Sequence, residues 1–310
     1  MEIGLQASGA YSDVLEGARW AEAQGLSTFA VPDHYVSGLA ENAERTGDAF
    51  DAFAVLAGLA RETTSIQLAV LVTPITFRHP AVIVKNAVTI DHMSGGRFAL
   101  GIGTGWHERE HAIFGLPFPE RAQRFEMMED ALAYTRAALH PGPSGYAGEF
   151  YQLEDVVIEP APQGALPLLV GGVGDHVTPR LAGRFADEYN VYPAESERMA
   201  ARIARMREAA EAAGRDPDQI VLSSAGQVLT APTRSEYEAL FRARAAEAGI
   251  DPETLEQHYE DRQTPRGTLD QVVEQISDFR GLGVARFYLQ RVATGDHTAS
   301  EQLVAALRDL

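Results

Sequence analysis

The amino-acid sequence predicts an α/β fold, and within that class a single (β/α)8 barrel of the TIM type that spans residues 1–310. Apolar segments of strand length alternate with amphipathic segments of helical length along the whole chain. Strands that alternate with helices pair in parallel, because parallel neighbours need a crossover connection. Eight such units in 310 residues favour a closed barrel. An open doubly wound sheet is the alternative fold.

The eight predicted strands are short runs dominated by aliphatic and aromatic residues. They cover residues 2–7, 27–31, 66–72, 97–102, 167–171, 188–192, 220–225 and 286–290. Between them, apolar side chains recur at helical spacing, as Val14, Ala18 and Ala21 do in the first helix. The predicted helices cover residues 12–25, 48–61, 80–93, 120–139, 178–186, 197–214, 235–248, 268–282 and 298–307.

Two stretches interrupt this alternation. Residues 141–166 are rich in Gly and Pro around a short extended piece at residues 149–158, and we interpret them as an insertion that carries a hairpin. Residues 248–266 read as a second insertion, a polar helix and turn between the seventh and eighth strands. The loops that follow the carboxyl ends of barrel strands build the active site, so motifs at these positions carry the functional argument.

The composition limits the classes of partner. The chain has 26 Lys and Arg against 44 Asp and Glu, a formal net charge of −18, which disfavours nucleic acid and anionic membrane surfaces. It contains no Cys, which excludes disulfides, thiolate nucleophiles and Cys-ligated zinc. We find no secretory leader and no apolar run approaching the ~18 residues of a membrane span. We therefore expect a cytoplasmic protein that acts on a small-molecule substrate.

Two glycine turns follow neighbouring predicted strands. After the fourth strand, alternation places Gly101 and Gly103 on one face, which predicts nearly bare backbone on which a flat anionic ligand can lie. After the fifth strand come Gly171, Gly172 and Gly174. Together the two turns predict a phosphate site lined by backbone N–H groups. The alternative is that loops of α/β proteins are simply rich in glycine.

Asp33 and His34 follow the second strand directly. A carboxylate beside an imidazole can move a proton, because an unperturbed histidine titrates near neutral pH. The alternative is a turn with a solvated Asp33 and a packed His34. The third strand ends at Pro74, because proline cannot continue an interior ladder.

The segment HEREH matches the zinc-protease pattern H-E-x-x-H, with His107 and His111 as ligands and Glu108 as base. The Gly and His of the extended metal motif are missing downstream, although Glu126 or Glu129 can serve as a further ligand. A charged helix start is the favoured interpretation. A zinc hydrolase is a distant alternative, and we predict no metal site.

Four blocks occur in an order typical of one family: AEAQGLSTFAVPDH, TPITFRHPAVIVKNAVTIDHMSGGRFALGIGTGWHEREH, GLPFPERAQRFEMMEDAL and GRFADEYN. Together they resemble the luciferase-like monooxygenase superfamily, and most closely its coenzyme F-420 (deazaflavin)-dependent oxidoreductases. The resemblance implies a TIM-like barrel and hydride transfer between F-420 and a small organic substrate. The alternative within the superfamily is a monooxygenase that uses reduced FMN and oxygen.

The resemblance also implies roles for individual residues. Asp33 and His34 would lie beside the reactive end of the cofactor ring, with His34 as the proton donor or acceptor. The residues implied to hold the cofactor are Val70 and Leu71, in a bulge often built on a non-prolyl cis peptide, Thr104 and Gly105 at its tail or phosphate, and Gly171, Gly172 and Gly174 at its phosphate.

Asn190 would line the substrate side. Sugar-phosphate dehydrogenases of the family carry an acidic Glu where this chain has Trp106, which favours an apolar or aromatic substrate. Family members are commonly dimers, so a homodimer is expected.

Overall fold

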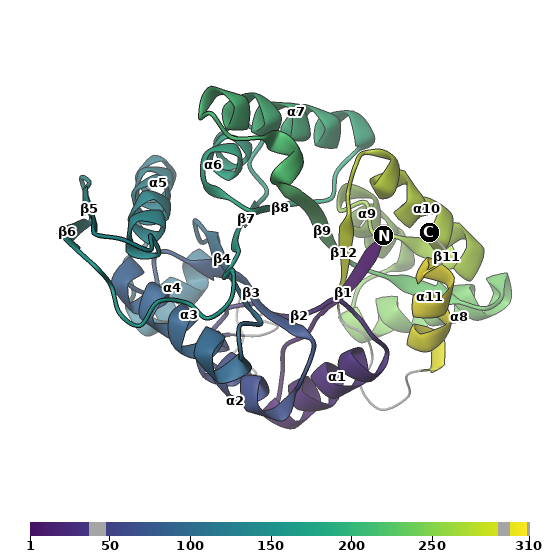
Figure 1. Ribbon diagram of the computed structural model, residues 1–310. Coiled ribbons are helices and arrows are strands. Elements are labelled where there is room, and N and C mark those ends of the chain that lie inside the picture. The colour runs from purple at the N-terminus through teal and green to yellow at the C-terminus, as the bar shows by residue number, and fades with distance from the viewer. Residues whose placement is uncertain (37–47, 291–297, 309–310) are drawn as a thin grey trace.

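The protein is described here by a computed structural model in which residues 1–36, 48–290 and 298–308 are placed. Eight parallel strands close into a barrel in the order β1-β12-β9-β8-β7-β4-β3-β2 (Figure 1). They are β1 (Glu2–Gln6), β2 (Thr28–Val31), β3 (Gln67–Pro74), β4 (Phe98–Gly103), β7 (Leu168–Gly172), β8 (Glu188–Val191), β9 (Val221–Gln227) and β12 (Arg286–Gln290). The predicted closed barrel is confirmed, and the open-sheet alternative is wrong.

Helices cover the outside of the barrel (Figure 1). They are α1 (Tyr11–Ala23), α2 (Ala52–Glu62), α3 (Pro80–Ser94), α5 (Arg121–Ala138), α6 (Val177–Phe185), α7 (Ser196–Ala212), α10 (Leu269–Gly281) and α11 (Thr298–Arg308). Their ends follow local chemistry, as α3 shows. Pro80 occupies its first turn, where the missing N–H costs nothing, and Gly95 ends it at φ 71°. Among the helices described, none combines the length and hydropathy that a membrane span requires.

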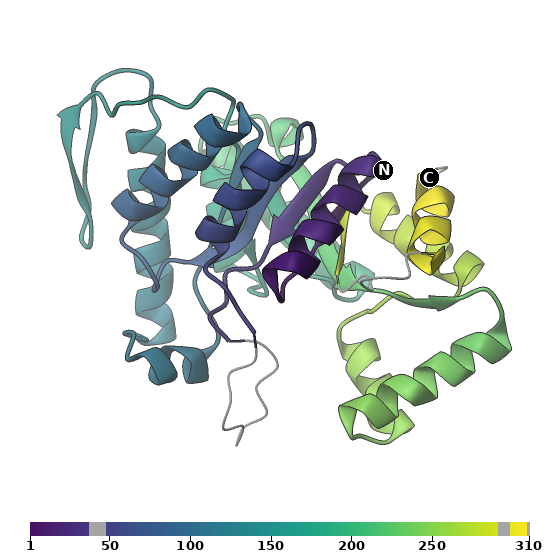
Figure 2. The same ribbon diagram turned by 90° about the horizontal axis from the view of Figure 1, so that it is seen from below.

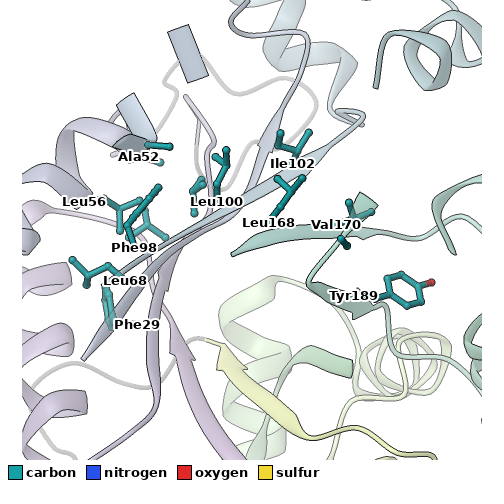
Figure 3. Close-up of a cluster of buried hydrophobic side chains, with 14 of the residues drawn as sticks. Phe29, Ala52, Leu56, Leu68, Phe98, Leu100, Ile102, Leu168, Val170 and Tyr189 are labelled. Atoms are coloured by element: carbon teal, nitrogen blue, oxygen red, sulfur yellow. The ribbon is translucent and has the colours of Figure 1, made fainter. Parts of the chain in front are cut away.

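The core has an outer and an inner layer. Side chains that point outward from the strands, such as Phe29, Leu68 and Phe98, pack against the helices (Figure 3). Inside the barrel lies a smaller cluster of Ala30, Ala69, Leu71, Ala99, Leu169 and Tyr288. This split follows from the period of two along each strand. Small residues point inward because eight strands leave little space within the barrel.

The amino end of the barrel is filled by a polar network. The Tyr288 hydroxyl donates to the Glu188 carboxylate at 3.0 Å, and Arg286 forms an ion pair with the same carboxylate at 2.5 Å. Burial raises the pKa of Tyr288 first, and the adjacent Glu188 charge raises it further, so the hydroxyl stays protonated and donates. A ligand therefore has access from the opposite end, where the strands finish.

Two segments extend beyond the barrel. Residues 141–166 include the antiparallel hairpin of β5 (Ser144–Ala147) and β6 (Gln152–Val156) (Figure 1). Between β9 and β12 the chain forms β10 (Leu229–Ala231), α8 (Arg234–Ala248), α9 (Pro252–Asp261) and β11 (Arg266–Thr268). Helices α8 and α9 project from the side of the barrel (Figure 2), over their own core around Tyr237, Leu255 and Tyr259.

Candidate active site

The predicted site residues follow different strands but reach the same end of the barrel, because all eight strands are parallel. His34 follows β2, Trp106 follows β4, Gly174 follows β7 and Asn190 lies in β8. The short helix α4 (Glu108–Phe114) lies beyond β4 at this end. The sequence predicts this placement from strand order alone.

A buried carboxylate holds the imidazole of His34. The Nδ1 atom of His34 lies 3.0 Å from Glu110 Oε2, and the His34 side chain is 33% exposed whereas that of Glu110 is 1% exposed. Glu110 also accepts from the backbone N–H groups of Tyr35 and Val36. Burial raises the pKa of Glu110, but the hydrogen bonds from His34 and the two amides outweigh it, so the net shift is downward.

The contact with Glu110 indicates which ring nitrogen of His34 carries the proton. An ionised carboxylate only accepts hydrogen bonds, so Nδ1 of His34 carries the proton that faces Glu110. Among the described residues, none is hydrogen bonded to Nε2 of His34. The sequence does not single out Glu110, because it lies 76 residues from His34 and inside a segment that reads as a charged helix start.

Asp33 points into a different environment. Its carboxylate is buried, accepts from Thr73 Oγ1 at 2.6 Å and forms an ion pair with Arg78, which also binds Asp51. Arg78 is itself only 10% exposed. Asp33 therefore ties the end of β2 to the end of β3 and the start of α2, whereas the adjacent His34 faces the open end.

An exposed aromatic side chain stands beside the imidazole. Trp106 is 72% exposed, and its ring centroid lies 5.7 Å from that of His34, edge to face at 77°. The indole also stacks on His107 at 4.9 Å. Trp106 thus presents an exposed apolar ring beside the imidazole.

The glycines of β4 accommodate a side chain of the protein itself. A Cβ at Gly101 would lie 2.2 Å from the Val70 carbonyl oxygen, and one at Gly103 would lie 2.7 Å from Val72 Cγ2. Val72 therefore occupies the space that the missing side chains leave. The expectation that a flat ligand rests directly on these glycines is wrong for that reason.

The bulge expected at Val70 and Leu71 lies at this point. The register between β3 and β4 shifts between Val70 and Thr73, and the peptide bond between Leu71 and Val72 is cis. Val70 and Leu71 are buried, and the Leu71 carbonyl accepts from Gln6 Nε2 at 2.5 Å. Val72 is the partly exposed residue of the bulge.

The remaining predicted residues form two groups. Gly105 has φ 78° and packs on Thr76 and Pro74, with Thr104 partly exposed before it. Gly171 pairs with Asn190 across β7 and β8, and a Cβ on Gly171 would lie 3.2 Å from Val72 Cγ1. Val72 thus connects the two glycine turns.

Asn190, Gly172 and Gly174 complete the predicted residues in or just after β7 and β8. The Asn190 side chain donates to Ser223 Oγ at 3.0 Å inside the barrel. Gly172 has φ 155°, and a Cβ at Gly174 would lie 2.7 Å from Thr178 Oγ1. The turn after β7 therefore needs glycine at both positions.

The geometry of HEREH does not favour the zinc hydrolase. His111 is buried, with Nε2 2.7 Å from Thr76 Oγ1 and Nδ1 2.8 Å from the His107 carbonyl oxygen. Both ring nitrogens of His111 therefore have partners within the protein, and the Glu110 carboxylate binds His34. Within residues 1–36, 48–290 and 298–308, no cluster of three or more His, Asp or Glu side chains is arranged to hold a metal.

Known proteins share this sequence pattern. The family model of the luciferase-like monooxygenases matches residues 2–286. An F-420-dependent glucose-6-phosphate dehydrogenase of Kineococcus radiotolerans is 30% identical over 226 residues, covering 71% of this chain and 65% of that protein. A pyrimidine monooxygenase of Allorhizobium ampelinum is 29% identical over 213 residues, covering 66% and 56%. The matches span between about half and two thirds of these relatives.

A solved structure shares the fold over nearly its whole length. An F-420-dependent secondary alcohol dehydrogenase, in complex with an F-420–acetone adduct, superposes with a TM-score of 0.80 over 99% of both chains at 21% identity. The relatives are thus oxidoreductases, both F-420-dependent enzymes and a monooxygenase. With a family model matched from residue 2 to residue 286, this chain belongs to the luciferase-like monooxygenase family.

Proposed function

We propose that this protein is an oxidoreductase that transfers a hydride between coenzyme F-420 and a small apolar or aromatic substrate. The observation that carries the proposal is His34 at the open end of the barrel, bound through Nδ1 to the buried carboxylate of Glu110. Relatives that depend on F-420 support the choice of cofactor. The barrel supplies orientation and the exclusion of water.

The residues at the carboxyl ends of the strands fit a planar cofactor with an anionic tail. Val72 offers an apolar, partly exposed surface between the two glycine turns for the back of a ring. Gly172 and Gly174 carry no side chains, so their backbone N–H groups are the donors that we expect to meet a phosphate. The deazaflavin, when bound, supplies the site that accepts or donates the hydride.

His34 handles the proton that accompanies the hydride. When an alcohol substrate is oxidised to a carbonyl compound, a hydride leaves its carbon and a proton must leave its hydroxyl group. The unprotonated Nε2 of His34 accepts that proton, and returns it in the reverse direction. Glu110 keeps the imidazole oriented throughout, and Asp33 acts through Arg78 on the loop that bears His34.

The alternative is a monooxygenase that uses reduced FMN and oxygen, in line with the monooxygenase relative. Titrating the purified protein with F-420 and with FMN, followed by fluorescence quenching, separates the two. We expect F-420 to bind more tightly. Tight binding of FMN alone would replace the proposal with the alternative.

His34→Ala tests the role of the imidazole. We expect turnover to fall by about 10²-fold or more while the affinity for the cofactor stays within about twofold. His258→Ala is the matched control, because His258 is exposed on α9 outside the site. Unchanged turnover in the His34 variant would remove this residue from the mechanism.

A further inference from the structure

Arg202 on α7 is the largest side chain among the described residues that is almost completely buried, with 1% of its surface exposed. A buried guanidinium is costly unless every donor group finds a partner. The groups that Arg202 binds should therefore explain why it is buried.

Arg202 connects the two loops that follow β7 and β8. Its Nε donates to Asp175 Oδ1 at 2.8 Å, its Nη2 to the Val173 carbonyl at 2.9 Å and its Nη1 to the Tyr192 carbonyl at 2.8 Å. Each of its three nitrogens thus makes one hydrogen bond to these two loops. We therefore look for its effect on a ligand in the position of the loops.

The contact with Val173 sets the direction of the next amide. The C=O and N–H of a trans peptide point in opposite directions. Because the Val173 carbonyl is held toward α7, the N–H of Gly174 points away from α7. Within the described ranges, no group of the protein accepts that N–H.

The surroundings of this turn are locally positive. Asp175 accepts from Arg198 at 2.8 Å as well as from Arg202, and the Asp175 carbonyl accepts from Arg205 at 3.2 Å. Two guanidinium groups thus bind the Asp175 carboxylate and a third binds its backbone carbonyl, in a chain whose formal net charge is −18. Such a local excess of positive charge behind free backbone donors favours an anion.

We propose that Arg202 is a positioning residue for the phosphate of the cofactor. By holding the Val173 carbonyl toward α7, it directs the amide of Gly174 to the side from which a phosphate approaches. The inference rests on the proposed function, because it requires a phosphate-bearing cofactor. It adds a residue that does not itself touch the cofactor.

Pairs of ligands that differ in the phosphate-bearing tail isolate this effect. The probes are FMN against riboflavin, and F-420 against 8-hydroxy-5-deazariboflavin. For Arg202→Lys and Arg202→Met we expect affinity for the phosphate-bearing member to fall about tenfold, with the phosphate-free member changing less than about twofold. Arg207→Met is the matched control, because Arg207 lies on α7 as Arg202 does and forms an exposed ion pair with Asp218. This variant should change the affinity for neither member of a pair.

A purely structural role would lower the affinity for both members equally, and that result overturns the proposal, as does unchanged affinity for both. If Arg202→Met does not fold, Arg202→Lys and the wild-type protein still decide the question. In the wild type, hydrogen exchange of the Gly174 amide should slow with FMN or F-420 and stay unchanged with the phosphate-free chromophores. Failure of the wild type to bind any of the four would overturn the proposed function itself.

Discussion

Glu110 and His34 form a buried carboxylate–imidazole pair across 76 residues of sequence, with Oε2 and Nδ1 3.0 Å apart. The same carboxylate binds the amides of Tyr35 and Val36, so one side chain sets both the path of the loop after β2 and the orientation of the ring. Catalytic histidines depend on such a partner to present the correct nitrogen.

Replacing Glu110 with Gln should therefore impair turnover without impairing cofactor binding. Glutamine keeps the volume but removes the charge, and its amide can donate as well as accept, so Nδ1 of His34 loses its fixed acceptor. We expect turnover to fall about tenfold to a hundredfold. Nitrogen NMR of the His34 imidazole should show a mixture of tautomers. Glu108→Gln, exposed on the same helix, is the control, and equal loss in both variants would contradict the prediction.

Replacing Trp106 with Ala should change substrate affinity and leave stability unaltered. The side chain is 72% exposed, so its removal costs the fold within about 0.5 kcal/mol. For an aromatic substrate we expect KM to rise about tenfold, the equivalent of ~1.4 kcal/mol of lost ring contact. Trp106→Phe should recover most of the affinity. An unchanged KM in the alanine variant, measured by steady-state kinetics, would show that substrate does not reach the indole.

The contact between Gly103 and Val72 predicts a specific rescue. Gly103→Ala should cost about 1–3 kcal/mol of the free energy of unfolding, because its new Cβ meets Val72 Cγ2 at 2.7 Å. Val72→Ala removes that atom, so the double variant should be more stable than the sum of the single effects by about 1 kcal/mol.

Gly101→Ala is the control for this cycle. Its Cβ would lie 2.2 Å from the Val70 carbonyl oxygen, a backbone atom that Val72→Ala leaves in place, and 2.9 Å from Val72 Cγ1. Because the backbone clash remains in the double variant, we expect a smaller rescue there than at Gly103. Denaturant unfolding of the four variants measures the effect, and strictly additive losses at Gly103 would show that Val72 does not fill the space.

Glu22 predicts an acid-dependent loss of stability. Burial raises the pKa of Glu22, but the amides of Ser65, Ile66 and Thr64 donate to Oε1 and lower it to about 2. A carboxyl whose folded pKa lies below its unfolded value of 4.5 stabilises the protein above that pH. This contribution is lost as the pH falls from 4.5 toward 2.

Glu22→Gln should therefore reduce stability by about 1 kcal/mol at pH 7, a modest value because the site is half-buried and screened by solvent. The difference from the wild type should shrink as the pH falls below about 4.5. Thermal unfolding across this pH range is the measurement. Glu62→Gln, which breaks an exposed pair with Arg19, should show little effect, and a difference at Glu22 that does not vary with pH would refute the assignment.

The strands could be predicted from the sequence because their signal is local. The run at residues 286–290 has aromatic and aliphatic residues at its centre, Phe287, Tyr288 and Leu289, and it forms β12 with the same bounds. The three-residue strands β10 and β11 could not be predicted, since such short pieces gain their structure from pairing with each other.

The site was less accessible to sequence reasoning, because its important contacts are distant in the chain. The pattern at Gly101 and Gly103 indicates missing side chains, but it does not reveal that Val72 from a neighbouring strand fills the space. Glu110 and Arg202 read as ordinary helix residues, and their burial depends on which loops pack over them. The role of His34 stays a prediction, and its signal is its place just after the end of β2.

The closing strand of the barrel has a consequence for biosynthesis. β12 pairs with both β1 and β9, so the sheet remains an open ribbon until residues 286–290 have been made. While the ribosome elongates the chain, β1 and later β9 present unsatisfied hydrogen-bonding edges, which are templates for aggregation. A nascent polypeptide that lacks this final strand therefore keeps one edge of β1 and one edge of β9 unpaired.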